Sequence, residues 1–220
     1  MTISTRTITT LLFDWDGTVV DSAQLGLTAY EKAFAELGIL FDHETYRAVY
    51  SPNWLSVYEG LGLPKEQWQR ADELWTHHYG EQSAELIEGA GETLGQLRQK
   101  GLRMGVVSSG NDCRVNREIE EQGLAGVFEV VICHEQISHR KPHPEGLETA
   151  MRALGCAQME VGYVGDTPED IEMGKGAGVL TVGVRSAYPT SWKLESAQPD
   201  ILIESLTELA DHFFGAVARP

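Results

Sequence analysis

The stretch Leu12-Phe13-Asp14-Trp15-Asp16-Gly17-Thr18-Val19-Val20-Asp21 decides the fold, because an apolar run ends there in two closely spaced acids. In an open α/β sheet, ligands bind beyond the carboxyl ends of the strands, so Asp14 and Asp16 are expected beside a cleft. Two neighbouring carboxylates repel each other unless a proton or a cation shares them, and Mg²⁺, which prefers oxygen ligands, would relieve that repulsion. The same residues also fit a plain turn in which Asp16-Gly17 reverses the chain. This stretch alone leaves both interpretations open.

Further apolar runs of strand length recur along the chain, separated by helix-length segments with apolar residues three and four apart. With the first run they are Ile8–Phe13, Met104–Val107, Val127–Ile132, Val161–Val164 and Val179–Val184. Strands alternating with helices predict an α/β fold, a Rossmann-like parallel sheet with helices on both of its faces.

One interval, from about residue 22 to residue 85, breaks this alternation and shows helical periodicity without a convincing strand. Leu27, Tyr30, Phe34 and Leu37 fall on one face of a helix that Gly38 is placed to end. A second helical stretch is predicted from about residue 65 to residue 86. The sequence therefore predicts an all-helical insertion after the first strand.

The overall composition limits the classes of partner. The 220 residues carry 17 Lys and Arg against 33 Asp and Glu, a formal charge of −16, and 42% of them are hydrophobic. This length predicts one large domain, or one domain with an insertion, and excludes a disordered chain. An acidic chain is a poor partner for nucleic acids and anionic membranes, which are themselves polyanions. No apolar run approaches the roughly 20 residues of a membrane span, and the polar start leads directly into a strand, so we expect a cytoplasmic protein.

The cysteines and histidines do not suggest a zinc site. Cys113, Cys133 and Cys156 contain no C-x-x-C pair and are interpreted as small core residues. His139 and His143 have the spacing of a helical metal pair, but the prolines at 142 and 144 forbid a continuous helix there. His77 and His78 lie in a polar helical stretch and are interpreted as a solvated helix face.

Polar residues follow the later strands in the same way as the first. Ser108-Ser109-Gly110 follows the second strand, where hydroxyls and backbone N–H groups before a helix suit phosphate oxygens. Lys141 lies between the third and fourth strands, in a loop that two prolines stiffen. Asp166 ends the fourth strand, and Asp170 lies in the first turn of the next helix, where an acid also has a plain capping role.

Taken together, these four segments resemble the haloacid dehalogenase-like hydrolase superfamily, and more narrowly its phosphoglycolate phosphatase-like branch. The family pattern Asp-x-Asp-Gly-Thr matches residues 14–18, and its strand-ending Ser or Thr matches Ser108. Its Lys-Pro pair matches Lys141-Pro142, and its Gly-Asp-x-x-x-Asp pattern matches residues 165–170. The resemblance spans nearly the whole chain, and it implies a core domain of residues 1–20 and 86–220 with a helical cap of residues 21–85.

The resemblance implies a Mg²⁺-dependent phosphatase that acts on a small phosphorylated metabolite. Asp14 would be the nucleophile that forms an aspartyl-phosphate, and Asp16 would act as general acid and then as general base. Mg²⁺ would lie between Asp14, the backbone carbonyl of Asp16 and Asp166. Lys141 and Ser108 would hold the phosphate oxygens as charge redistributes.

Four further residues take supporting roles by the same resemblance. Backbone N–H groups near Ser109 and Gly110 would help to bind phosphate, Thr18 would support the site, and Asp170 would orient Lys141 or a metal-bound water. By resemblance, 2-phosphoglycolate is the first candidate substrate, followed by a sugar phosphate or pyrophosphate.

Three alternatives remain. A phosphonate hydrolase would use a cap lysine, for which Lys32 and Lys65 are available, but Asp16 speaks against it. A sugar phosphomutase shares all four motifs, and the cap region offers Arg47 without a clear basic cluster. A phospho-acceptor signalling module would also use strand-end acids around Mg²⁺, yet it needs neither an insertion nor a second acid.

Two features have a structural interpretation beside a functional one. Tyr46, Tyr50, Asn53 and Trp54 are candidate specificity residues of the cap, and they also fit packing between cap helices. The run Gly174-Lys175-Gly176-Ala177-Gly178 lacks the Gly-Lys-Ser/Thr ending of a phosphate-binding loop and is interpreted as a helix stop. The oligomeric state is left open.

Overall fold

A computed structural model describes residues 7–214, and its centre is a six-stranded sheet in which every neighbouring pair is parallel. The strand order is β5-β4-β1-β6-β7-β8. The strands are β1 (Thr10–Phe13), β4 (Arg103–Val107), β5 (Val130–Ile132), β6 (Val161–Gly165), β7 (Leu180–Val184) and β8 (Ile201–Ile203). The prediction of a Rossmann-like α/β sheet is therefore confirmed.

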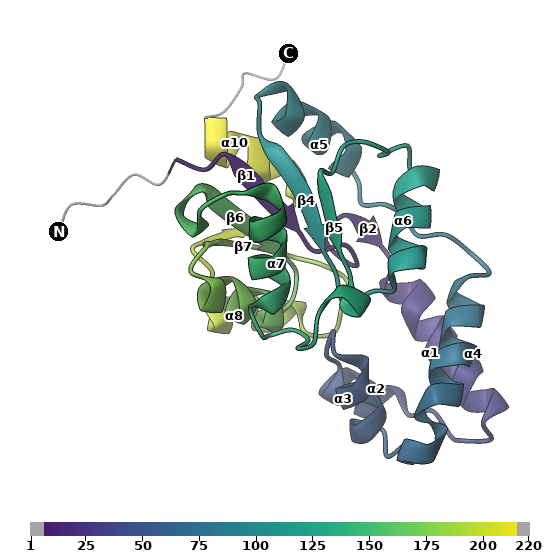
Figure 1. The fold of residues 1–220 in the computed structure, drawn as a ribbon. Coiled ribbons are helices and arrows are strands. Elements are labelled where there is room, and N and C mark those ends of the chain that lie inside the picture. The colour runs from purple at the N-terminus through teal and green to yellow at the C-terminus, as the bar shows by residue number, and fades with distance from the viewer. Residues whose placement is uncertain (1–6, 215–220) are drawn as a thin grey trace.

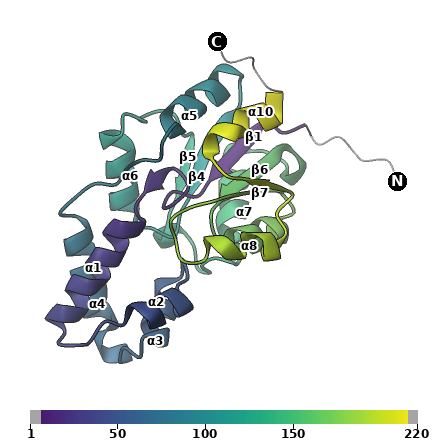
Figure 2. The same cartoon turned by 180° about the vertical axis from the view of Figure 1, so that it is seen from behind.

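Helices cover both faces of this sheet (Figures 1 and 2). Alternation along β1 explains why, since Leu11 and Phe13 enter one apolar cluster and Leu12 enters the other. The first cluster is covered by α5 (Ala90–Gln99), α6 (Asp112–Glu121) and α10 (Leu209–Phe214), and the second by α7 (Glu145–Leu154) and α8 (Pro168–Ala177). The short helix α9 (Leu194–Ala197) packs on α8. Within residues 7–214, 3₁₀ helices lie at 65–67, 134–136, 158–160, 191–193 and 206–208.

The interval after β1 is helical, as expected, and lies away from the main sheet (Figure 1). It contains α1 (Ala23–Glu36), α2 (His43–Val49), α3 (Trp54–Gly60) and α4 (Trp68–Tyr79). We call these four helices the helical insertion. Its own apolar cluster includes Tyr30, Phe34 and Tyr58, so the insertion has a core separate from the two clusters of the sheet.

A two-stranded antiparallel ribbon, which the sequence did not reveal, joins the insertion to the sheet domain. It consists of β2 (Val20–Asp21) and β3 (Glu85–Leu86), paired Val20 with Leu86. The predicted helix from 65 to 86 is therefore wrong at its end, because α4 stops at Tyr79 and the chain turns before β3.

Two other expectations differ from the structure in detail. The strand expected from residue 127 begins only at Val130, because residues 125–127 form a turn. The Gly174–Gly178 run is not wholly a helix stop, since α8 continues through Ala177 and only Gly178, with φ of 72°, ends it. Gly174 lies inside the helix, where a Cβ would come within 2.5 Å of the Thr181 side chain.

Across residues 7–214, no helix combines the length and apolar character that crossing a membrane requires.

Candidate active site

Three of the predicted site residues meet where the strands of the sheet end. Asp14 follows β1, Asp166 follows β6, and Lys141 lies in the loop between β5 and α7. The Lys141 Nζ lies 2.7 Å from Asp14 Oδ1 and 2.7 Å from Asp170 Oδ1, and all of these side chains are buried. The structure thus brings the first, third and fourth predicted motifs together.

Asp166 completes a group of buried carboxylates. One oxygen each of Asp14, Asp166 and Asp170 lies within 4.8 Å of the others. Asp166 accepts hydrogen bonds from Thr18 Oγ1 at 3.4 Å and from Ser186 Oγ at 2.6 Å. Its hydrogen-bond donors are therefore hydroxyls, which do not neutralise its charge.

The electrostatics of this group favour a bound cation. Burial raises the pKa of Asp14 to about 7, although the charge of Lys141 opposes this rise. Burial and the neighbouring carboxylates also raise the pKa of Asp166 well above its ordinary value. Burial would lower the pKa of Lys141, but Asp14 and Asp170 outweigh it and raise that pKa. The three buried carboxylates offer only oxygen ligands and one lysine charge lies beside them, an arrangement that fits a hard divalent cation.

Asp170 has both roles that its position suggested. Its Oδ1 meets Lys141 and accepts a hydrogen bond from Tyr163 OH at 3.0 Å, while its Oδ2 accepts from Thr167 N and Oγ1 at the start of α8. It therefore fixes Lys141 and caps the helix at once.

The Asp16 side chain points to a different group of residues. Arg114 donates from both ends of its guanidinium, over 3.0 Å to Asp16 Oδ1 and 2.6 Å to Oδ2, and Ser22 Oγ donates over 2.8 Å to Oδ1. Burial would raise the pKa of Asp16, but the charge and hydrogen bonds of Arg114 outweigh burial and hold that pKa below its ordinary value. Any metal contact of Asp16 would thus fall to its backbone carbonyl, as the family resemblance implies.

A cavity of about 280 Å³ lies between the sheet edge and the helical insertion. The predicted residues that line this cavity are Asp14, Asp16, Ser109, Gly110, Tyr46, Tyr50 and Trp54. Ser108 is buried beside it, and its Oγ accepts a hydrogen bond from Gly110 N at 2.9 Å. Asn53 instead lines a neighbouring hollow together with residues 138–143.

Sequence reasoning missed Arg114, Ser22, Ser186 and Tyr188, although all four contact the predicted acids or one another. Ser22 Oγ and Tyr188 OH lie 2.9 Å apart, and Tyr188 lines the cavity. For Arg114 a signal existed. It occupies the first turn of a helix, where the helix dipole disfavours a cation, so a nearby anion would stabilise it.

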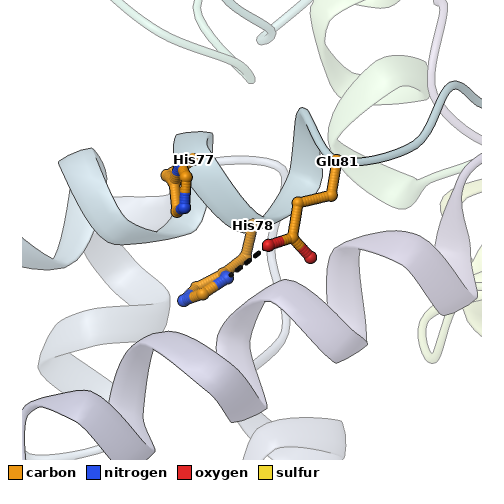
Figure 3. Close-up of side chains that lie close together, drawn as sticks. All are labelled: His77, His78 and Glu81. Carbon is orange, nitrogen blue, oxygen red and sulfur yellow. Dashed lines mark ion pairs between the residues drawn. The ribbon is translucent and has the colours of Figure 1, made fainter.

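The histidine pairs and the cysteines differ in part from their interpretations. His77 is exposed, but His78 is not simply solvated, because it bonds Glu36 of α1 at 2.7 Å and pairs with Glu81 at 3.5 Å (Figure 3). The rings of His139 and His143 stack 4.4 Å apart in a loop, so no helix is needed to bring them together. Of the cysteines only Cys133 is a core residue, since Cys113 is exposed and Cys156 is half-buried.

Comparison with known proteins gives the family of this chain. The family model described as haloacid dehalogenase-like hydrolase matches residues 11–184. The chain is 31% identical over 209 residues to a pyrophosphatase, PpaX, of Listeria monocytogenes, covering 93% of this chain and 96% of the relative. It is 29% identical to a phosphoglycolate phosphatase of Escherichia coli O157:H7, covering 90% and 89%.

A solved structure shares the fold. A haloacid dehalogenase-like family hydrolase from Streptococcus pneumoniae superposes with a TM-score of 0.82 at 22% identity, covering 94% of this chain and 98% of the other. On the family match and these relatives, the chain belongs to the haloacid dehalogenase-like hydrolase family, and it is a phosphatase.

Proposed function

We propose that this phosphatase is Mg²⁺-dependent and hydrolyses a small phosphomonoester, with 2-phosphoglycolate as the first candidate, through an aspartyl-phosphate on Asp14. The observation that carries the proposal is the position of Asp14. Its carboxylate lines the cavity, is held by Lys141 at 2.7 Å, and lies in a group with two other buried acids.

In the first half-reaction, a carboxylate oxygen of Asp14 attacks phosphorus and the bond from phosphorus to the ester oxygen breaks. Asp16 then supplies a proton to the leaving oxygen. Arg114 keeps Asp16 deprotonated in the structure, so Asp16 takes up that proton from solvent only once its contact with Arg114 is released. Lys141, the Ser108 hydroxyl and the backbone N–H at Ser109 hold the remaining phosphate oxygens. The Gly110 N–H donates to Ser108 Oγ in the structure, so Gly110 would contribute by fixing that hydroxyl. In the second half-reaction, Asp16 takes a proton from water, the water oxygen attacks phosphorus, and the bond to Asp14 breaks to release phosphate.

The metal would be held by Asp14, Asp166 and the backbone carbonyl of Asp16. When bound, it supplies the positive charge that lets an anionic nucleophile approach an anionic phosphate. Thr18 and Asp170 would act as supporting residues, through their contacts with Asp166 and Lys141. The helical insertion would act as a cap, with residues 21–85 as its extent and residues 1–20 and 86–220 as the core.

Two further substrates belong in the test. Pyrophosphate is favoured by the 31% identical relative named as a pyrophosphatase. A hexose phosphate tests the phosphomutase alternative.

The phosphonate hydrolase alternative has less support, because Lys32 pairs with Glu81 and the Lys65 ammonium lies over Trp68. We also propose a cytoplasmic location, in keeping with the three cysteines, all of which are free.

The test measures phosphate release from 2-phosphoglycolate, pyrophosphate and a hexose phosphate, with Mg²⁺ and with a chelator. Asp14→Asn should reduce release to background, and Asp16→Asn should slow it by about 10²- to 10⁴-fold. Asp21→Asn, an exposed acid in the same stretch, serves as the matched control and should retain activity. Release that persists in Asp14→Asn would contradict the mechanism. Little release together with hexose phosphate isomerisation would favour the mutase, and a lasting phospho-Asp14 without turnover would favour a signalling module.

A further inference from the structure

Arg114 is a buried cation at the active site that the proposed mechanism leaves without a role. Its side chain is only 8% exposed and lines the same cavity as Asp14 and Asp16. Among the described residues that line this cavity, it is the one Lys or Arg side chain. The other charged groups on the wall include three acids, Asp14, Asp16 and Asp72.

The surrounding residues hold the guanidinium in place. Glu118, one turn further along α6 and fully buried, accepts a hydrogen bond from Arg114 at 3.1 Å. Glu118 in turn accepts from Trp15 Nε1 at 2.7 Å. The Tyr79 ring lies 4.7 Å from the guanidinium carbon. A cation in the first turn of a helix opposes the helix dipole, and these contacts offset that cost.

The pairing of Arg114 with Asp16 also conflicts with what Asp16 must do. Arg114 occupies both carboxylate oxygens of Asp16, and Ser22 occupies one of them as well. These three bonds use most of the roughly four lone-pair positions of the carboxylate, and the positive charge of Arg114 disfavours the protonated form that Asp16 needs to act as an acid. A second anion that drew Arg114 away from Asp16 would therefore favour protonation of Asp16. Its buried Nε has no hydrogen-bond partner among the described residues and leaves further donor capacity.

We propose that Arg114 is a specificity-determining residue that binds a second anionic group of the substrate, a carboxylate or phosphate attached close to the ester oxygen. The inference rests on the proposed function, in which Asp16 contacts that ester oxygen. Because Arg114 lies within hydrogen-bond distance of Asp16, an anion one or two bonds beyond the ester oxygen comes within its reach. The planar guanidinium matches a carboxylate or phosphate with two parallel hydrogen bonds. On binding, it exchanges Asp16 for the substrate anion and frees an Asp16 oxygen.

The test compares two substrates that differ only in the second anion. 2-Phosphoglycolate carries a carboxylate where ethyl phosphate carries a methyl group. Wild-type protein should show a kcat/KM for 2-phosphoglycolate at least 10 times that for ethyl phosphate. Arg114→Gln should lower this ratio by about 10- to 100-fold, mainly through KM, as expected for the loss of a charge-assisted bidentate contact. Arg114→Lys, which keeps the charge without the planar fork, should restore part of the ratio.

Arg117→Gln is the matched control, because Arg117 lies on the same helix with its side chain 40% exposed, and it should leave the ratio unchanged. An unchanged ratio in Arg114→Gln, or a wild-type protein that does not distinguish the two substrates, would overturn the inference. Should Arg114→Gln fail to fold, calorimetry on Asp14→Asn decides, since this protein keeps Arg114. It should bind 2-phosphoglycolate at least 10 times more tightly than ethyl phosphate, and equal affinities would refute the proposal. Absence of phosphate release from both substrates in wild type would instead count against the proposed function.

Discussion

Lys141 is enclosed by two carboxylates, and replacing it with Met should destabilise the metal-free protein strongly. The substitution leaves Asp14 and Asp170 buried without their cation, a loss expected to lower the free energy of unfolding by about 3–5 kcal/mol. Urea unfolding measures this quantity. Lys32→Met, which breaks a solvent-exposed pair with Glu81, is the control and should lower stability far less. Similar losses in both variants would mean that the buried network contributes no more than a surface pair.

Alanine substitutions at Gly17 and Gly62 separate the effect of backbone strain from the effect of crowding in the active site. Both have positive φ, 80° and 73°, but a Cβ on Gly17 would come within 2.5 Å of Asp166 Oδ2 and of the Tyr188 ring, whereas nothing lies within 4 Å of one on Gly62. Alanine at Gly62 should cost about 1–2 kcal/mol of stability through backbone strain alone, and alanine at Gly17 should cost more because of the added clash. Only Gly17→Ala displaces Asp166, and it should reduce kcat/KM on the order of 100-fold. Equal activities of the two variants would show that the site tolerates this displacement.

At the scale of whole elements, Trp54 of α3 connects the helical insertion to the sheet domain. Its ring lies 4.3 Å from the Arg140 guanidinium and 4.9 Å from the His134 ring. Trp54→Ala should accelerate amide hydrogen exchange in α2 and α3 and raise KM several-fold, because the insertion is then held less firmly over the cavity. Trp68→Ala provides the comparison, since Trp68 packs within the insertion on Leu63 and Lys65. If Trp68→Ala raised KM as much as Trp54→Ala, the effect would come from the packing of the insertion, not from its attachment.

Helices and strands could be predicted where the pattern of apolar residues was long. The prediction failed where that pattern was short. The apolar runs of the five predicted strands and the face of α1 were sufficient to predict a parallel sheet with a helical insertion. The ribbon of β2 and β3 has two residues in each strand, too few to show a period of two. The end of α4 at Tyr79 was missed although Gly80, a typical helix stop, follows directly, because Glu81 and Gln82 beyond it are again acceptable in a helix.

The same contrast applies to the site residues. Asp14, Asp166 and Lys141 could be brought together from sequence because the carboxyl ends of parallel strands share one edge. The pair of Arg114 with Asp16 joins residues 98 positions apart, and the bond of Ser186 to Asp166 comes from a loop after β7 that carried no recognisable motif. Such contacts depend on how a loop and a helix pack, which no local pattern specifies.

For the molecule as a whole, the buried carboxylates predict how stability depends on pH. The pKa of Asp14 in the folded protein is about 7 and that of Asp166 is also raised, against an ordinary value of 3.8. Between about pH 4 and pH 7 the folded state therefore binds more protons than the unfolded state, so the stability of the metal-free protein should fall as pH rises through this window. Thermal unfolding in a chelator at a series of pH values measures it. Asp166→Asn should flatten the decline, and an equally steep decline in that variant would assign it to other groups.

Mg²⁺ should reverse this loss, because it binds the deprotonated carboxylates of the folded state and not the unfolded chain. At about 100 times its Kd, a ligand of this kind adds about 2.7 kcal/mol, which corresponds to a rise in Tm of about 5–10 °C for a domain of this size. The rise should be larger at pH 8 than at pH 5, where protons compete for Asp14 and Asp166. NaCl at matched ionic strength controls for general screening, and Asp166→Asn should lose most of the rise. A rise that NaCl reproduced, or that Asp166→Asn retained in full, would place the cation elsewhere on this acidic chain.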